Sequence, residues 1–239
     1  MYLDKKILVV IPARGGSKGI PYKNIKNLNG KPLITYSIDV ARQIVSDEHI
    51  CVSTDDEKIK KVVEDYGLKV PFLRPDDLAT DTATTNDVLL HTIQFYEREG
   101  ILYDIILLLQ PTSPLRTEQH LKEALALYQE DCDMVVSVRK SHAPVVLCQE
   151  DERGYLESLF NRKNSRRQDL FSFYEYNGAI YIINVKSLKN IGLSNFEKKI
   201  KYVMDDSSSI DIDTPIDWEI AEYFLRIRNK NVDMQIVVL

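Results

Sequence analysis

The chain has 239 residues, of which 44% are apolar and 28% charged, and its 31 basic and 36 acidic side chains give a formal net charge of −5. This composition excludes a disordered or fibrous protein, and a chain of this length can bury enough apolar surface to fold without disulfides or a structural metal. The acidic balance argues against general binding to nucleic acid, which needs a basic face, but it is compatible with a local basic pocket for a small anion.

The sequence also limits the expected location of the protein. No apolar stretch approaches the roughly 20 residues of a membrane-spanning helix, and the first residues show no signal-peptide pattern. The three cysteines, Cys51, Cys132 and Cys148, are too few and too far apart for a disulfide framework or a zinc site. We therefore expect a cytoplasmic protein without a membrane or nucleic-acid partner.

Short apolar runs alternate with amphipathic stretches over the first 139 residues. The β-branched run Ile7–Ile11 predicts a strand buried on both faces, and the apolar spacing over Pro32–Val45 predicts a helix that begins at its proline. Because strands and helices alternate, we expect an α/β fold with a mainly parallel sheet and helices on both faces. The further predicted strands are Ile50–Ser53, Lys69–Leu73, Ile105–Leu109 and Met134–Val138, and the further predicted helices are Asp56–Tyr66, Asn86–Glu99 and Thr117–Gln129.

The alternation breaks over residues 140–176, which hold short strand-like pieces and a basic, aromatic stretch. We expect these residues to form an excursion from a single α/β domain made of residues 1–139 and 177–228. Within the second part, Ala179–Asn184 predicts a strand. The sequence Thr214-Pro215-Ile216-Asp217 predicts the start of a last helix that reaches about Arg228. Residues 229–239 give no clear signal.

The loop after the first strand is the first candidate site, because open parallel sheets bind ligands at the carboxyl ends of their strands. Its glycines can bring backbone N–H groups close to a phosphate, and its cations Arg14, Lys18 and Lys23 suit a polyphosphate. The loop is neither a Walker A motif nor a Gly-x-Gly-x-x-Gly motif. The alternative is a flexible glycine turn with solvated lysines. The loop reads Pro12-Ala13-Arg14-Gly15-Gly16-Ser17-Lys18-Gly19-Ile20-Pro21-Tyr22-Lys23-Asn24.

Two further segments carry candidate site residues. In Ser209-Ile210-Asp211-Ile212-Asp213, alternate side chains of an extended chain point the same way, so Asp211 and Asp213 can converge on one Mg²⁺ ion. Asp213 can equally be a solvated acid before a helix. The segment Leu109–Arg116 leaves the most apolar strand, and its Gln110 and Thr112 offer hydrogen bonds, although an ordinary proline turn fits as well.

Several separated motifs together resemble the N-acylneuraminate cytidylyltransferase family, the CMP-sialic acid synthetases, with their relatives for legionaminic and pseudaminic acids. The resemblance runs from about Ile7 to about Arg226 and is more specific for the family than for the sugar. It implies a Rossmann-like α/β fold with a small protruding dimerisation arm, and hence a homodimer. The motifs are, in chain order, IPARGGSKGIPYKNI, STDD, RPDDLATDTATT, LLQPTSPLR, RRQD, NGAIYI and SIDIDT.

The resemblance implies that CTP and an acidic nine-carbon sugar give a CMP-sugar and pyrophosphate, with Mg²⁺ as cofactor. The catalytic positions would be Arg14, Lys18, Lys23 and Asp211, and Mg²⁺ would be held by Asp211 and Asp213. By the same matching, the nucleotide would contact Ala13, Arg14, Gly15, Gly16, Asn24, Arg74, Thr85 and Gln110. The sugar would contact Gln110, Thr112, Arg167, Asn177 and Tyr181.

Three alternatives stay open at this point. The segment 142–147 lacks the lysine that often occurs there in the sialic-acid enzymes, so legionaminic acid or a related acid is an alternative substrate. A synthetase for the eight-carbon acid KDO is a second alternative, although its loop usually reads closer to Ala-Arg-x-x-Ser-x-Arg-Leu-Pro. A non-catalytic nucleotide-binding subunit is the third.

The basic cluster around Arg167 also fits a nucleic-acid patch or a solvated loop. No histidine is marked as a general base, and the proton acceptor is either solvent or Asp211.

Overall fold

The computed structural model describes residues 5–16, 19–80, 82–141, 147–150, 152–158 and 172–236. Within these residues the main sheet has six strands in the order β10-β6-β9-β5-β1-β4. All neighbours are parallel except β9, which is antiparallel to both β5 and β6. The expected mainly parallel α/β sheet is therefore confirmed. Its strands are β1 (Ile7–Pro12), β4 (Ile50–Ser53), β5 (Ile105–Leu108), β6 (Met134–Ser141), β9 (Phe173–Asn184) and β10 (Lys199–Val203).

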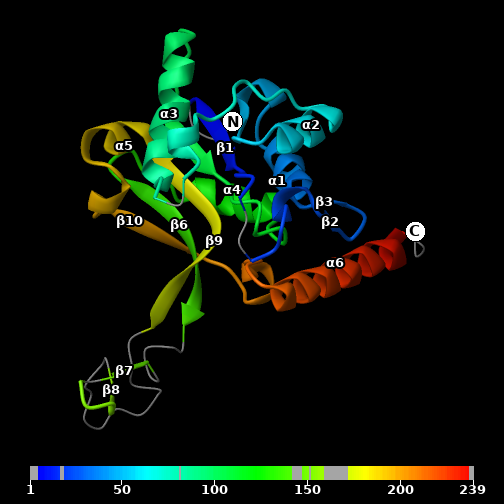
Figure 1. The fold of residues 1–239 in the computed structure, drawn as a ribbon, viewed down its shortest axis with the longest axis vertical. Helices are drawn as coiled ribbons and strands as arrows, with labels where there is room; N and C mark the ends of the chain where they lie inside the picture. Colours follow the sequence, from blue (N-terminus) through cyan, green and yellow to red (C-terminus); the bar gives the residue numbers. More distant parts are fainter. Residues whose placement is uncertain are drawn as a thin grey trace.

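Helices cover both faces of this sheet, as expected (Figure 1). Alternate residues of β1 explain how: Val9 packs toward α1, α2 and α4, whereas Leu8 and Val10 pack toward α3 and α5. A strand that is apolar on both faces requires this arrangement. The helices are α1 (Leu33–Arg42), α2 (Glu57–Asp65), α3 (Thr85–Arg98), α4 (Glu118–Ala126), α5 (Val185–Ile191) and α6 (Pro215–Ile236).

Four elements differ from the predictions. Residues 69–73 do not form a sheet strand; only a single bridge joins Leu73 to Thr54 beyond the edge strand β4. The helix α5 and the strand β10 have no counterpart among the predicted elements. The last helix continues to Ile236, beyond the predicted end near Arg228. No helix among the described residues is long and apolar enough to span a membrane.

The strands β6 and β9 continue past the sheet as a two-stranded ribbon, with Ser141 paired to Phe173 (Figure 1). A small hairpin of β7 (Cys148–Glu150) and β8 (Leu156–Ser158) lies beyond the end of this ribbon. We call the ribbon and hairpin the arm. It occupies the region where the sequence predicts an excursion.

A third apolar cluster fixes α6 to the body. Trp218, Ala221 and Leu225 of α6 pack against Leu33 and Ile212. The small hairpin of β2 (Asn27–Leu28) and β3 (Lys31–Pro32) contributes Leu28 to the same cluster. The start of α6 and the segment before it are thereby held beside the loop that follows β1.

Candidate active site

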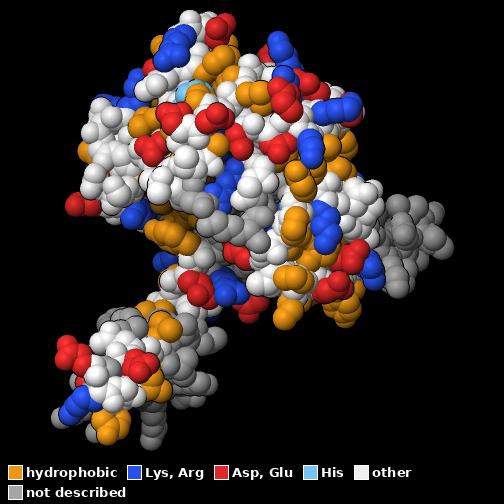
Figure 2. Space-filling view, viewed as in Figure 1, with side chains coloured by type: hydrophobic (Ala, Val, Ile, Leu, Met, Phe, Trp, Pro, Cys, Tyr) orange, Lys and Arg blue, Asp and Glu red, His pale blue; other side chains and the backbone are white. Residues whose placement is uncertain are grey.

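The order of the strands locates the site. From β1 the chain moves to β4 on one side and then to β5 on the other, so the carboxyl ends of β1 and β5 flank a topological switch point, where open α/β sheets bind ligands. Because β9 runs the opposite way, its residues 177–179 reach the same edge of the sheet, past the paired Tyr181 and Leu108. Figure 2 shows Lys and Arg side chains inside a hollow near the middle of the face it displays.

The first cavity lies directly beyond β1 and has a volume of about 350 Å³. Arg14 and Lys23 supply positive charge, and Gln110 and Thr112 supply polar groups from the segment after β5. Asp213 closes the opposite side, from the segment that precedes α6. The full lining is Pro12, Arg14, Gly19, Lys23, Asn24, Gln110, Pro111, Thr112 and Asp213.

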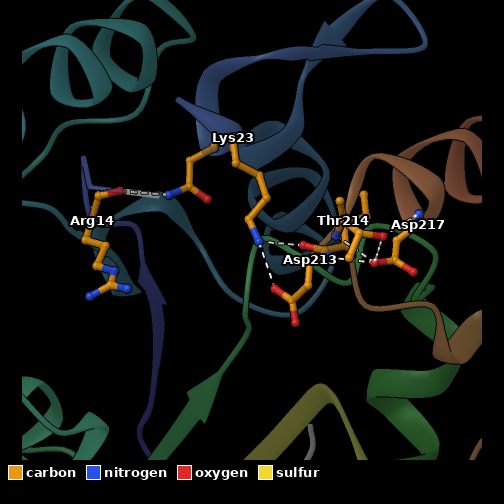
Figure 3. Close-up of polar contacts among 7 residues, drawn as sticks. Arg14, Lys23, Asp213, Thr214 and Asp217 are labelled. Atoms are coloured by element: carbon orange, nitrogen blue, oxygen red, sulfur yellow. Dashed lines mark hydrogen bonds and ion pairs between the residues drawn. The ribbon is translucent and has the colours of Figure 1, made fainter. Parts of the chain in front are cut away.

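Lys23 joins the glycine loop to the acidic segment near residue 212. Its Nζ donates to the backbone carbonyl of Ile212 at 2.5 Å and to Asp213 Oδ1 at 3.0 Å (Figure 3). The backbone also requires this closeness, because a Cβ on Gly19 would collide with the carbonyl oxygen of Asp213. The two segments therefore meet in space, as their shared predicted role requires.

Neighbouring residues fix the shape of the loop. Asn24 is buried and donates from Nδ2 to the carbonyl of Arg14 at 3.1 Å, so the loop is closed across its base. The N–H of Gly15 donates to Asp55 Oδ1 at 3.1 Å, and the N–H of Ala13 donates to the carbonyl of Ser53 at 2.9 Å. A Cβ added at Gly16 would meet no other atom within 4 Å. The predicted loop cation Lys18 lies outside the described residues.

The second cavity, of about 370 Å³, shares Pro12, Arg14 and Gln110 with the first. The shared residues form a common wall, and the second cavity extends from it toward the start of α3, where Thr85 lies. Six of its twelve lining residues are apolar and six are polar or charged. The remaining lining residues are Arg74, Leu78, Thr80, Ala83, Thr84, Thr85, Val88, Leu89 and Leu108.

Arg74 is already bonded within the protein. Its Nε donates to Ser53 Oγ at 3.1 Å, its Nη2 to the Ser53 carbonyl at 2.5 Å, and its Nη1 to the Leu78 carbonyl at 3.4 Å. Burial lowers the pKa of this guanidinium. Arg74 therefore shapes the cavity wall by tying the loop near Leu78 to the end of β4.

The third cavity, of about 200 Å³, contains Asp211. Burial raises the pKa of this carboxyl, opposed by hydrogen bonding from the Thr112 side chain and by the charge of Lys23. Its Oδ1 atom is buried and has no hydrogen-bond partner among the described residues. The full lining is Arg139, Glu175, Tyr176, Asn177, Ser209, Ile210, Asp211 and Asp217.

Of the five predicted sugar-contacting residues, Asn177 lines this third cavity, whereas Gln110 and Thr112 line the first. Asn177 is buried, but both ends of its amide are engaged: Oδ1 accepts from Ser137 Oγ at 2.6 Å, and Nδ2 donates to Ser209 Oγ at 2.9 Å. Tyr181 packs in the core between the sheet and α3 and α5, and burial raises its pKa, with the charge of Asp211 adding to the effect. Arg167 lies outside the described residues.

The donor set fits a magnesium ion in part. Asp211 offers a buried oxygen without a partner among the described residues, and the side chain of Asp213 is 75% exposed beside the cationic cavity. Carboxylate oxygens are ligands that Mg²⁺ prefers, and the ion usually keeps several positions for phosphate or water. No cluster of three or more His, Cys, Asp or Glu side chains in the described part of the chain could hold a metal by itself. The magnesium assignment stays a prediction.

The structure adds residues to which the sequence reasoning gave no role in the site. Asp55 bonds the glycine loop, and Asp217 accepts from the N–H groups of Asp213 and Thr214 at 3.1 and 2.7 Å. Arg116 lies buried behind the site. Asp55 and Arg116 belong to two quoted motifs, STDD and LLQPTSPLR, but only their contacts reveal what they do.

Comparisons with known proteins give the family and the fold that the chain resembles. The model of a family described as cytidylyltransferase matches residues 8–235. The chain is 36% identical over 236 residues to CMP-N,N'-diacetyllegionaminic acid synthase of Legionella pneumophila, covering 94% of this chain and 98% of that protein. It is 32% identical over 232 residues to pseudaminic acid cytidylyltransferase of Campylobacter jejuni, covering 95% and 99%.

A longer relative matches equally well in sequence. The chain is 36% identical over 228 residues to N-acylneuraminate cytidylyltransferase of Escherichia coli, covering 94% of this chain and 53% of that protein. The chain thus spans about half the length of this relative.

Two solved structures share the fold. A CMP:2-keto-3-deoxy-manno-octonic acid synthetase complexed with CTP superposes with a TM-score of 0.68 at 18% identity, covering 93% of this chain and 99% of that chain. A 4-diphosphocytidyl-2C-methyl-D-erythritol synthase from Anaerococcus prevotii gives a TM-score of 0.62 at 15% identity, with the same coverage of 93% and 99%. At these identities the likeness establishes the fold alone.

Proposed function

The chain belongs to the cytidylyltransferase family, and from this premise we propose that it transfers the cytidylyl group of CTP to a nonulosonic acid, with release of pyrophosphate. The carrying observation is the common wall that includes Arg14 and Gln110, which joins the second cavity, with its mixed apolar and polar lining, to the cationic first cavity that Asp213 borders. A nucleoside, a polyphosphate and an acceptor near an acid can be placed along such a path. The acceptor is N-acetylneuraminic acid or a close relative such as legionaminic or pseudaminic acid.

In this reaction the anomeric hydroxyl of the sugar acid attacks the α-phosphorus of CTP. A bond forms between the sugar oxygen and phosphorus, the bond to the bridging oxygen breaks, and pyrophosphate leaves. The proton of the hydroxyl passes to solvent or to Asp211. Transfer of this kind depends on positioning and charge neutralisation rather than on a protein nucleophile.

The residues divide into three groups. Arg14, Lys18 and Lys23 neutralise and orient the triphosphate, on a loop that Asn24 closes. Arg74, Thr85 and Gln110 shape the nucleoside cavity. Ala13, Gly15 and Gly16 belong to the loop beside it, in which the N–H groups of Ala13 and Gly15 already donate to Ser53 and Asp55. The sugar lies beside Thr112, Asn177 and Tyr181, and Arg167 binds its carboxylate.

Magnesium completes the proposal. Asp211 and Asp213 would hold the ion, which when bound would offset phosphate charge and favour ionisation of the attacking hydroxyl. The partially buried Asp211 carboxylate and the exposed Asp213 carboxylate supply oxygen ligands on the acidic side of the site.

The assembly and location belong to the same proposal. We expect a homodimer in which the arm takes part in the interface. We expect the enzyme to work in the cytoplasm, and the buried cysteines Cys51 and Cys132, which form no disulfide, are consistent with a reducing environment.

The direct test is pyrophosphate release from CTP and Mg²⁺ with N-acetylneuraminic, legionaminic and pseudaminic acids and KDO as acceptors. Release with at least one nine-carbon acid, and much less with ATP or UTP in place of CTP, is expected. Turnover of KDO alone would make the chain a KDO-activating enzyme. No release with any acceptor, despite CTP binding, would make it a non-catalytic nucleotide-binding subunit.

A further inference from the structure

A bulge in β9 forms the floor beneath Asp211. Between Val136 and Val138 the register of β6 and β9 shifts, so that residues 177–180 stand opposite Ser137 alone. At the centre of this bulge, Gly178 has a φ of +74°, and a Cβ there would lie 3.2 Å from Asp211 Oδ2. The Asp211 carboxylate therefore packs directly against the backbone of the bulge, and its position depends on the position of Gly178.

One side of the bulge is fixed by Asn177. Its Oδ1 accepts from the N–H of Ala179 at 3.2 Å and from Ser137 Oγ, and Ser137 Oγ in turn accepts from the N–H of Ile180 at 2.7 Å. These bonds stabilise the bulge within the sheet. They leave the carbonyl of Ala179 to be satisfied from elsewhere.

Arg116 satisfies that carbonyl and at the same time holds the end of β5. Its Nη1 donates to the carbonyl of Ala179 at 3.1 Å and to the carbonyl of Gln110 at 2.8 Å. Gln110 belongs to the wall that the first two cavities share. One guanidinium nitrogen thus connects the common wall of the first two cavities to the bulge in β9 against which the Asp211 carboxylate packs.

The remaining contact of Arg116 points away from the site. Its Nη2 donates to Ser37 Oγ of α1. The side chain is almost completely buried, with 5% exposure. Burial lowers its pKa to about 9, and attraction to Asp211 opposes this, so the group stays cationic at neutral pH. Lysine could keep the charge, but its side chain is shorter, and it lacks the planar fork that holds Nη1 between the two carbonyls while Nη2 bonds Ser37.

We propose that Arg116 is a positioning residue for the transfer reaction. By donating hydrogen bonds to the carbonyls of both Gln110 and Ala179, it fixes the Asp211 carboxylate relative to the common wall of the first two cavities. This inference rests on the proposed function. Arg116 touches no substrate in this scheme. It acts through the backbone of β5 and β9, and a displacement of about 1 Å at a reacting group can cost about 100-fold in rate.

The test compares Arg116→Met and Arg116→Lys with Ser37→Ala, which removes only the contact on the far side of the same guanidinium. For each variant, the thermal midpoint, the CTP dissociation constant, and kcat and KM for the best acceptor are measured. Arg116→Met should lower kcat about 100-fold while CTP affinity changes by less than about 5-fold, and Arg116→Lys should restore only part of the loss. Ser37→Ala should lower the midpoint by several degrees and leave kcat within about 3-fold.

Two results would overturn the inference. One is a wild-type kcat in folded Arg116→Met. The other is a kcat in Ser37→Ala as low as that of the Arg116 variants at the same thermal midpoint, since the loss would then follow stability. If Arg116→Met does not fold, Arg116→Lys carries the comparison, and full recovery of kcat in it would reduce the role of Arg116 to its charge.

A second readout is independent of activity. Amide hydrogen exchange should increase in the segments 108–113 and 176–181 of Arg116→Lys but not of Ser37→Ala. Unchanged exchange in both segments would contradict the inference. If the wild-type chain releases no pyrophosphate with any acceptor, the proposed function fails, whereas this exchange measurement still decides whether Arg116 holds the two segments together.

Discussion

Lys23 and Asp213 show how single side chains connect parts of the site that lie far apart in sequence. The Lys23 ammonium, whose side chain is 12% exposed, pairs with Asp213 and with the carbonyl of the preceding residue. The pair holds the glycine loop against the start of α6. In the proposed reaction, a triphosphate would share Lys23 with Asp213, and a cation on the acidic side would favour that exchange.

At the same scale, Asp211→Asn should separate turnover from stability. We expect kcat to fall about 100-fold or more with a much smaller change in CTP affinity, because the carboxylate contributes most as charge redistributes during transfer. The midpoint of thermal unfolding of the metal-free protein at neutral pH should rise. Burial disfavours the ionised carboxyl of Asp211, and its Oδ1 has no hydrogen-bond partner among the described residues. Pyrophosphate release, CTP titration and a thermal scan measure the three quantities. Normal turnover in the variant would remove Asp211 from the reaction.

Among the elements, the connection from β10 to α6 is ordered mainly by local hydrogen bonds. Asp205 Oδ1 accepts from Ser207 Oγ at 2.5 Å and from the N–H of Ser208 at 2.8 Å, and Ser209 Oγ donates to the carbonyl of Asp205 at 2.6 Å. At the other end of the connection, Thr214 and Asp217 cap α6 reciprocally, with the N–H of each bonded to the side chain of the other. The segment that carries Asp211 and Asp213 is thus held at both ends.

This connection gives a pH prediction. Burial alone would raise the pKa of Asp205, but the hydrogen bonds from Ser207 and Ser208 outweigh it and lower the pKa to about 2. A carboxyl with a depressed folded-state pKa stabilises the protein above its unfolded pKa of about 4, and that stability is lost as the pH falls toward the folded-state value. Asp205→Asn should therefore lower the free energy of unfolding at neutral pH, and the difference from wild type should shrink below about pH 4.

Urea unfolding at a series of pH values measures this difference. Asp206→Asn is the matched control, because the neighbouring Asp206 side chain makes no capping hydrogen bond to the short helix Ser207–Ser209. A destabilisation of Asp205→Asn that stays constant over the whole pH range, or an equal effect in the control, would show that charge at Asp205 is not the cause.

For the whole molecule, the arm is the feature that the α/β domain does not need for its own core. Its described tip exposes large apolar side chains: Tyr155 is 66% and Leu156 is 75% exposed. On the adjoining ribbon, Tyr176 is 55% exposed. Exposed apolar groups gathered on a projecting element are typical of an interaction surface. This supports the proposed dimer, in which the arm of one copy would contact the other.

The prediction for the assembly is a dimer in sedimentation experiments. The double variant Tyr155→Asp with Leu156→Asp should shift it toward monomer, because two charges would have to be buried in the interface. Leu102→Asp is the control, since Leu102 is 67% exposed in the body of the molecule, far along the chain from the arm. A wild-type monomer at high protein concentration would refute the dimer, and dissociation by the control alone would move the interface to the body.

The sequence by itself determined the features that depend on local patterns. The apolar period of β1, the glycine and cations of the loop after it, and the cap, proline and acid at Thr214, Pro215 and Asp217 could be recognised because each is set by residues close together in the chain. The same patterns predicted the α/β class and the side of the sheet where the site lies.

Only the tertiary structure decided how distant segments pair. An apolar run such as residues 179–184 suits either strand direction. β9 runs antiparallel to β5 and β6 because it pairs with β6 along the ribbon of the arm and re-enters the sheet in the direction opposite to β6. The pattern at residues 69–73 is typical of a strand, but these residues pair with their neighbour only through the single bridge at Leu73. In contrast, β10 forms a full parallel pairing with β6. The bulge at residues 177–180, and the contact of Arg116 with two carbonyls 69 residues apart in the chain (Gln110 and Ala179), arise from packing that no local period encodes.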